Sequence, residues 1–322
     1  MEWKRLKAEL LAANTVRLEG EPCDGFISRS TAGPTAGGEG SVFFSKDGKR
    51  VRLSLGRKGP VRLRHHGKGR ATVHLGDLVV EGNLEPAGLH CPGQAYVNVS
   101  ERCIFHCRYC TVPFQKGGTK DPEAIEVRIR EVLDRVDAIS ITSGVADSLE
   151  AEEERVVSLV KRLLPLGKPI GVSIYPLPGT PERLHHLGVA EVKWNLEAAT
   201  PEIFARMCPG LDYEDVWKAL RDSVRLFGRG NVYSNVIFGL GETDEELERC
   251  IEDLASAGII PVLRPLNPSA EMASAPRPTA ERILKVFGVH DRILRRYGLD
   301  TKKARTMCTA CTGCDLVPGR DA

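Results

Sequence analysis

Three cysteines, Cys103, Cys107 and Cys110, lie within eight residues in the spacing C-x3-C-x2-C. Soft thiolates this close together favour an iron–sulfur cluster or zinc over hard cations such as magnesium. Three thiolates do not complete the four-ligand shell that a structural zinc ion usually has. In a 4Fe–4S cluster, three cysteines leave one iron open to a ligand that the protein does not supply. The motif alone is also compatible with a zinc knuckle or an electron-transfer cluster whose fourth ligand lies elsewhere.

A second group of thiols, Cys308, Cys311 and Cys314, lies near the C-terminus in the spacing C-x2-C-x2-C. Small residues separate these cysteines, so backbone N–H groups can approach the sulfurs of a cluster. The pattern predicts a second, auxiliary iron–sulfur cluster; a zinc-bound tail and a disordered tail with reactive thiols stay open as alternatives. The sequence does not identify a fourth ligand for this group, for which the candidates are Cys23, Ser28, Ser30 and Cys91.

The composition is that of an ordered globular chain: 42% of the 322 residues are hydrophobic, 27% are charged, and the net charge is +2. The charged N-terminus lacks the apolar core of a signal peptide, and no apolar run approaches the roughly 18 residues that span a membrane. We therefore expect a soluble cytoplasmic protein with no membrane segment. In the reducing cytosol its ten cysteines indicate metal or redox chemistry rather than disulfides.

The first ninety residues are expected to form a small β-rich domain. Residues 1–20 carry leucines at helical spacing and predict an amphipathic helix. Residues 23–40 are rich in glycine and hydroxyl side chains and predict a loop, either near a substrate or at the surface. Residues 41–81 alternate apolar and polar side chains around an Asp47-Gly48 turn, which predicts antiparallel strands.

Positive charge is concentrated in this β-rich region, with ten basic residues and one acid between residues 46 and 70. Such a face is either simply solvated or a docking surface for an acidic partner. Few aromatic side chains are interleaved, which argues against the base stacking that single-stranded nucleic acids need. An acidic carrier protein is therefore favoured over RNA.

From about residue 94, strand and helix patterns alternate. Repeated βα units predict a parallel sheet with helices outside, and six units fall short of the eight in a full barrel. We therefore expect an α/β fold in which a partial (β/α)6 TIM barrel (residues 91–300) lies between the β-rich domain (1–90) and a cysteine-rich tail (301–322). The expected strands are 95–100, 137–143, 169–175, 191–196, 231–238 and 261–266, and the expected helices include 122–135, 152–164, 214–226 and 244–257.

Chemistry in βα barrels gathers at the C-terminal ends of the strands, and the first cysteine motif follows the first strand. With Tyr109 before its last cysteine, this motif resembles the signature of the radical S-adenosylmethionine (SAM) superfamily. Further motifs follow successive strands. Thr142-Ser143-Gly144 resembles the segment whose backbone meets the methionyl amino end of SAM in this superfamily. Asn195 and Glu197 are similar to the residues that hold the ribose and methionine moieties in biotin synthase and its relatives.

Three more positions complete the cofactor pocket that the resemblance implies. Arg206 resembles the arginine that pairs with the SAM carboxylate, for which a guanidinium fork is well suited. The segment around Ile237 is close to the adenine-binding pattern Gly-x-Ile-x-Gly-x-x-Glu, with Val236 in place of its first glycine, and Leu266 would also lie beside the adenine. The resemblance covers residues 94–300 and is strongest to biotin synthase, hydrogenase-maturation and methylornithine synthase relatives.

The resemblance implies a shared first step. SAM binds the open iron, one electron breaks a C–S bond, and a 5′-deoxyadenosyl radical abstracts hydrogen from an unactivated carbon. The electron would come from a donor of the ferredoxin or flavodoxin type. Because Tyr233 replaces a cysteine ligand that biotin synthase has on strand five, the chain is not expected to be a biotin synthase.

The overall layout resembles one subunit of the two-component archaeal lipoyl synthase. That resemblance implies sulfur insertion into a protein-bound octanoyl chain, with the auxiliary cluster as sulfur donor, an acidic lipoyl-carrier protein on the basic face and a second radical SAM subunit. Methylation, methylthiolation or rearrangement of another substrate is the alternative within the superfamily. A two-cluster electron carrier or a zinc adaptor is the alternative outside enzymes, and the distributed cofactor pocket argues against it.

Overall fold

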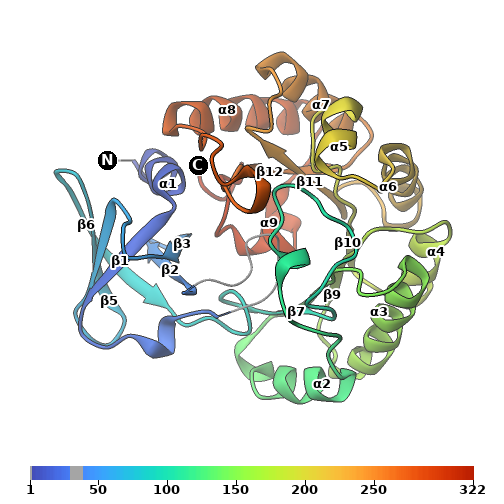
Figure 1. Ribbon diagram of the computed structural model, residues 1–322, viewed down its shortest axis with the longest axis horizontal. Helices are drawn as coiled ribbons and strands as arrows, with labels where there is room; N and C mark the ends of the chain where they lie inside the picture. Colours follow the sequence, from blue (N-terminus) through green and yellow to red (C-terminus); the bar gives the residue numbers. More distant parts are fainter. Residues whose placement is uncertain (1, 30–38) are drawn as a thin grey trace.

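The computed structural model describes residues 2–29 and 39–322. Two β structures lie side by side, a small barrel built from the N-terminal quarter and a larger curved sheet with helices on its outer side (Figure 1). The last residues of the chain run between them. No helix in these ranges is long and apolar enough to cross a membrane.

The N-terminal unit starts with helix α1 (Trp3–Ala13), on which Leu6, Leu10 and Leu11 are buried. Asn14 ends this helix with φ at 56°, so the predicted helix stops earlier than residue 20 and a strand follows. Six strands then close into a barrel in the order β1-β3-β2-β6-β5-β4. They are β1 (Thr15–Gly20), β2 (Ser41–Lys46), β3 (Lys49–Leu55), β4 (Val61–His65), β5 (Arg70–Leu75) and β6 (Leu78–Glu85).

The strands β2 to β6 pair antiparallel as predicted, but the barrel also contains parallel pairs. Strand β1 pairs in parallel with both β3 and β4, and this strand closes the barrel by removing the two edges that the meander would otherwise leave. The predicted hairpin is present, because Asp47 and Gly48 both take positive φ between β2 and β3, as a tight two-residue turn requires. Residues 30–38 of the predicted loop, including the candidate ligand Ser30, lie outside the described residues.

The second unit confirms the predicted α/β partial barrel. Its six strands are all parallel and follow the order β12-β11-β10-β9-β8-β7. The strands are β7 (Gln94–Asn98), β8 (Ala138–Thr142), β9 (Ile170–Ser173), β10 (Glu191–Lys193), β11 (Val232–Phe238) and β12 (Ile260–Pro265). The helices are α2 (Pro122–Arg130), α3 (Leu149–Leu163), α4 (Thr180–His186), α5 (Pro201–Met207), α6 (Tyr213–Phe227), α7 (Asp244–Ser256) and α8 (Ala280–Arg296). The domain boundaries at residues 90 and 300 stay predictions.

Side-chain caps fix where several of these helices begin. Asp121, Ser148, Thr200 and Asp212 each accept a hydrogen bond from a backbone N–H of the first turn. Thr243 and Glu246 form a reciprocal capping box at the start of α7. Such caps satisfy amides that the helix itself leaves unpaired.

The C-terminal tail fills the barrel from the N-terminal ends of the strands. Ser140 on β8 accepts from the backbone N–H of Met307 (2.9 Å), and Gln94 on β7 donates to the Met307 carbonyl (2.9 Å). Glu191, fully buried at the start of β10, accepts from the amides of Arg305 and Thr306 at 3.0 and 2.8 Å. The tail is therefore a bound plug that carries helix α9 (Met307–Cys311), not a loose extension.

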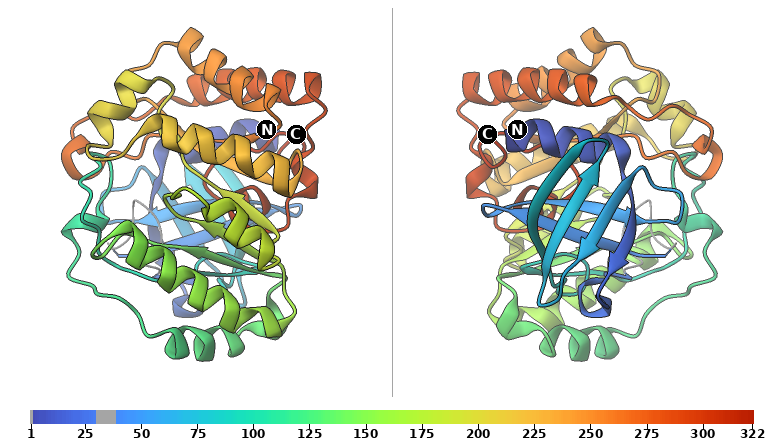
Figure 2. Two further views of the ribbon diagram at one scale, coloured as in Figure 1. Left: turned by 90° about the vertical axis from the view of Figure 1, so that its right-hand side faces the viewer. Right: turned by 90° about the vertical axis from the view of Figure 1, so that its left-hand side faces the viewer.

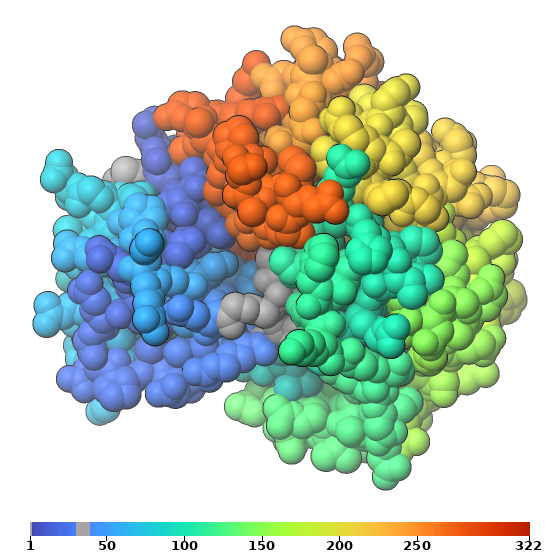
Figure 3. Space-filling model, viewed as in Figure 1, coloured from blue at the N-terminus to red at the C-terminus, as the bar shows by residue number. Residues whose placement is uncertain are grey.

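The tail also joins the two units. Lys7 of α1 is fully buried and donates to the Thr312 carbonyl (2.5 Å) and to Asp321 (2.7 Å), to which Trp3 also donates (3.0 Å). Helix α1 packs against α8 of the partial barrel (Figure 2). On the face shown in Figure 3, the segment after β12 lies between the N-terminal unit and the loop of the first cysteine motif.

A substitution at Gly171 tests whether the tail plug supports the fold. A Cβ at this position would lie 2.1 Å from Thr306 Oγ1, so Gly171→Ala should lower the free energy of unfolding by about 1–3 kcal/mol through overpacking. Gly288, exposed in α8, has no atom within 4 Å of the corresponding Cβ. Gly288→Ala should therefore stabilise the chain by about 0.5–1 kcal/mol. Denaturant unfolding measures the free energy of unfolding of both variants. If Gly171→Ala and Gly288→Ala changed it equally, the tail would not be a tightly packed plug.

Candidate active site

The loop that carries the first cysteine motif is held by the end of strand β8. A Cβ on Gly144 would lie 2.4 Å from the Arg102 carbonyl, so only glycine allows the loop to approach this closely. The backbone of Val145 then binds the loop twice, because its carbonyl accepts from Ile104 (2.8 Å) and its N–H donates to Cys103 Sγ (3.4 Å). On the other side, Ser269 Oγ donates to the Tyr109 carbonyl (2.7 Å).

The three thiols of this motif are partly buried and favour the protonated form without a metal. Burial raises the pKa of Cys103, and burial raises that of Cys110 to about 12. The pKa of Cys107 is raised first by its hydrogen bond with Cys208 and then by burial. Metal binding requires thiolates, so cluster assembly at this loop must release protons.

The described part of the chain shows no ready-made site for a single metal ion. Over residues 2–29 and 39–322, no three His, Cys, Asp or Glu side chains converge on a point that could hold a single metal ion. The thiolates of a 4Fe–4S cluster bind separate irons, so their sulfurs need not meet at one point.

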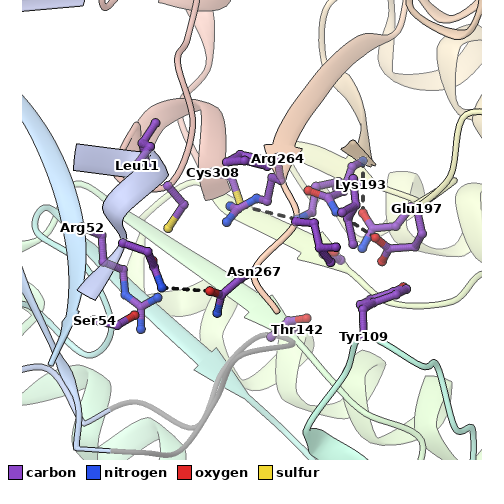
Figure 4. Close-up of a pocket in the computed structure, with 18 of the residues that line it drawn as sticks. Leu11, Arg52, Ser54, Tyr109, Thr142, Lys193, Glu197, Arg264, Asn267 and Cys308 are labelled. Carbon is purple, nitrogen blue, oxygen red and sulfur yellow. Dashed lines mark hydrogen bonds between the residues drawn. The ribbon is translucent and has the colours of Figure 1, made fainter. Parts of the chain in front are cut away.

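One cavity connects the strand ends, the N-terminal unit and the tail. Figure 4 shows Cys308 and Arg264 between Leu11 of α1 and the pair Lys193 and Glu197. The residues that line the cavity come from all three parts of the chain: Leu11, Asn14, Arg52, Ser54, His90, Tyr96, Tyr109, Thr142, Ser173, Lys193, Asn195, Glu197, Asn235, Ile237, Arg264, Pro265, Leu266, Asn267, Arg277, Cys308 and Cys314.

Glu197 and Asn235 form the polar centre of the pocket near the first motif. Asn235 Nδ2 donates to Glu197 Oε2 (2.8 Å), whereas Asn235 Oδ1 is buried and has no hydrogen-bond partner among the described residues. Burial raises the pKa of Glu197, and the hydrogen bond from Asn235 opposes that shift. Glu197 also has φ at 55°, a conformation that costs a non-glycine residue energy and is typical of functional positions.

This pocket has the features that a nucleoside requires. Glu197 and the unpartnered Asn235 oxygen are acceptors that ribose hydroxyl groups can satisfy. Tyr109, Ile237 and Leu266 belong to one buried apolar cluster and provide a wall for a flat base. Six sequence-predicted residues of the pocket thus line one cavity: Tyr109, Thr142, Asn195, Glu197, Ile237 and Leu266.

Three other predicted residues lie elsewhere. Ser143 accepts from the Ser100 amide (2.9 Å) and donates to Glu152, so its side chain supports the loop. Gly144 contacts Arg102, as described above. Arg206 is exposed and donates to the Leu240 carbonyl (3.1 Å), away from the cavity lining.

Cations surround the two tail thiols on the cavity. Lys193 is buried and donates to Cys308 Sγ (3.4 Å). Burial alone would lower the pKa of Arg264, but Cys308, Cys314 and Asp315 raise it well above its ordinary value. Burial lowers the pKa of Arg277 to about 10. These cations lie close to the tail thiols, and sequence reasoning missed them together with Asn235. For Lys193, Asn235 and Arg264, a charged or amide side chain inside an apolar strand was a visible signal.

With this geometry established, comparison with known proteins identifies the family. A family model described as the radical SAM superfamily matches residues 97–254. The chain belongs to the radical SAM superfamily. Membership implies a 4Fe–4S cluster and SAM as cofactors.

Several curated relatives are named lipoyl synthase. The one from Micrococcus luteus is 27% identical over 231 residues, which is 62% of this chain and 67% of that protein. The one from Corynebacterium diphtheriae is 31% identical over 179 residues, 53% of this chain and 50% of that protein. The chain thus spans about half to two thirds of the length of the curated relatives it matches.

Solved structures share the fold at low sequence identity. The FeFe-hydrogenase maturase HydG has a TM-score of 0.53 and 19% identity, with 62% of this chain and 50% of that chain covered. SuiB of Streptococcus suis, bound to the precursor peptide SuiA, has a TM-score of 0.54 and 13% identity, with 64% and 47% covered. These matches support the partial barrel fold.

Substitution of Asn235 tests the pocket. Asn235→Ala removes one donor to the buried Glu197 carboxylate and the unpartnered acceptor Asn235 Oδ1, so SAM should bind about 10- to 100-fold more weakly. The measurement is equilibrium dialysis of SAM against the anaerobically reconstituted protein. Asn231, which binds the Phe227 carbonyl before β11, is the matched control, and Asn231→Ala should keep the affinity. If both variants bound SAM with equal affinity, Asn235 would not belong to the SAM pocket.

Proposed function

We propose that this radical SAM enzyme inserts sulfur into an unactivated C–H bond of a protein-bound octanoyl chain. Cys103, Cys107 and Cys110 would hold the reducing 4Fe–4S cluster. Cys308, Cys311 and Cys314 would hold an auxiliary iron–sulfur cluster that donates the sulfur. The relatives named lipoyl synthase support this substrate class.

The observation that carries the proposal is the position of Cys308 and Cys314. Both line the cavity that Asn195, Glu197 and Asn235 also line. A substrate carbon in this cavity can therefore lie close to the bound nucleoside on one side and the tail sulfurs on the other. An electron relay would need no such shared space.

The residues of the chain position the reaction and exclude water. When bound, the first cluster and SAM supply the electron and the hydrogen-abstracting radical, and the auxiliary cluster supplies sulfide. Asn195, Glu197 and Asn235 orient the nucleoside, and the tail closes the barrel from below. Excluding water protects a reactive species from side reactions.

Charge around the auxiliary site fits an anionic cluster. Lys193 binds Cys308, and the raised pKa of Arg264 keeps its charge beside Cys314. Buried cations need anionic partners, and thiolates around an iron–sulfur core provide them. This argument favours a cluster over a neutral pair of thiols in the tail.

A lipoyl-carrier protein with an acidic surface is the proposed partner of the N-terminal barrel. Not all of the basic residues predicted for this face are available to a partner, because Arg52 lines the cavity and Arg50 forms an ion pair with Glu85 (3.1 Å). Arg62 and Arg64 of β4 are exposed, and Arg17 of β1 lies opposite Arg62 in the sheet. These three arginines form the proposed docking face.

An electron donor of the ferredoxin or flavodoxin type is proposed to dock at the loop of the first motif. Ile104 and Phe114 are large apolar side chains that are 44% and 61% exposed there. A donor on this surface would lie next to Cys103, which a short electron path requires. A second radical SAM subunit, as in the two-component lipoyl synthase, would complete the proposed system.

Removal of the tail thiols tests the sulfur-donor role. The Cys308/Cys311/Cys314→Ala variant should fall from about eight irons per chain to about four after anaerobic reconstitution. It should still form 5′-deoxyadenosine from SAM under reducing conditions, and mass spectrometry of an octanoylated carrier domain should find no added sulfur. A variant that keeps about eight irons, or a wild-type tail that holds zinc, would refute the proposal.

Charge reversal tests the docking face. Arg62→Glu with Arg64→Glu should raise the KM for the carrier domain about 10-fold, because like charges slow the encounter, with kcat little changed. The control reverses two exposed cations on the outer helices, Arg128→Glu in α2 and Lys161→Glu in α3, and should leave KM unchanged. If both double variants behave alike at low and high salt, the face is simply solvated.

A further inference from the structure

We infer that Cys91 is the fourth protein ligand of the auxiliary cluster and completes a four-cysteine set with Cys308, Cys311 and Cys314. The inference rests on the proposed function, in which the tail holds an iron–sulfur cluster. Clusters of this type usually take four cysteine ligands, and the tail motif supplies only three of them.

The turn that carries Cys91 is fixed directly to the tail. Cys91 is 0% exposed and lies between the N-terminal barrel and β7. Its carbonyl accepts from the Gly88 amide (3.0 Å), and it forms a β-bridge with Gln94. Gln94 in turn holds the Met307 carbonyl at the start of α9. The thiol of Cys91 is thus positioned by the same short turn that positions the tail cysteines.

Cys91 lies close to all three tail thiols. Its side chain is hydrogen-bonded to that of Cys311, and the charges of Cys311, Cys308 and Cys314 each act on it. Both side chains are buried, so Cys91 and Cys311 are close enough to bind neighbouring irons of one cluster.

The other buried cysteine beside a motif, Cys208, has a different setting. It contacts Cys107 and Tyr109, with 3.5 Å between its Sγ and the tyrosine hydroxyl. The first motif leaves one iron open to SAM, so it does not require Cys208 as a fourth protein ligand.

The alternative ligands for the tail are less well placed. The pKa of Cys23 responds to burial and to Asp24, and to no tail thiol. Ser28 Oγ already donates to the His90 carbonyl (3.0 Å). His90 lines the cavity, and its buried Nδ1 has no partner among the described residues, so an imidazole ligand is the main competing outcome.

The experiment isolates the auxiliary cluster in the full-length chain. In a Cys103/Cys107/Cys110→Ala background, the tail should hold about four irons. Adding Cys91→Ala should lower the iron content to about three per chain and convert the 4Fe–4S signal into a 3Fe–4S signal in EPR and Mössbauer spectra. Adding Cys91→Ser, which keeps an oxygen ligand, should restore about four irons with one altered iron site.

Matched variants make the outcome decisive. Cys250 is equally buried, in α7 and away from both motifs, so Cys250→Ala should leave the spectra unchanged. If Cys91→Ala also leaves them unchanged while His90→Ala alters them, Cys91 is not the ligand. If the Cys91→Ala variant unfolds, the Cys91→Ser variant decides: EPR and Mössbauer spectra identical to those of the background chain would show that Cys91 is not a ligand. No iron in the background chain would instead overturn the auxiliary cluster itself, and this inference with it.

Discussion

The buried carboxylate of Glu191 holds the C-terminal tail inside the barrel, and the architecture of the site depends on this contact. Glu191 accepts from the amides of Arg305 and Thr306, from the Thr306 hydroxyl (2.5 Å) and from Tyr233 on β11 (3.2 Å). A buried charge with several donors is stable, whereas the same charge without them would be costly. The hydrogen bonds from the tail amides therefore help to stabilise Glu191 inside strand β10.

Strand β10 and its continuation connect the tail to the cofactor pocket. Glu191, Lys193, Asn195 and Glu197 alternate along the chain, so they share one face, which points into the barrel. Glu191 binds the tail backbone, Lys193 binds Cys308, and Asn195 and Glu197 line the pocket near the first motif. At about 3.3 Å per residue, this row spans roughly 20 Å. One strand thus aligns both cysteine groups with a single cavity.

The sequence predicted the parts of this arrangement that repeat locally. All six parallel strands, the main helices and the strand-end residues Asn195 and Glu197 follow from periodicity and motif order. The destination of the tail could not be predicted, since its contacts join residues about 115 or more positions apart, as between Glu191 and Thr306. The closure of the N-terminal barrel by β1 depends on a similar long-range pairing. The predicted role of Arg206 stays a prediction, since its side chain donates to the Leu240 carbonyl and does not line the cavity.

Backbone strain marks the same region. Glu197, Met307 and Thr312 are non-glycine residues with positive φ, a conformation that costs about 1–3 kcal/mol each. Each is held by a buried side chain: Asn235 binds the Glu197 carboxylate, Gln94 binds the Met307 carbonyl, and Lys7 binds the Thr312 carbonyl. These holding residues come from three different elements, β11, β7 and α1. The conformations of Glu197, Met307 and Thr312 are therefore fixed by contacts between different parts of the fold, and such preorganisation helps a radical reaction to keep its intermediate from other targets.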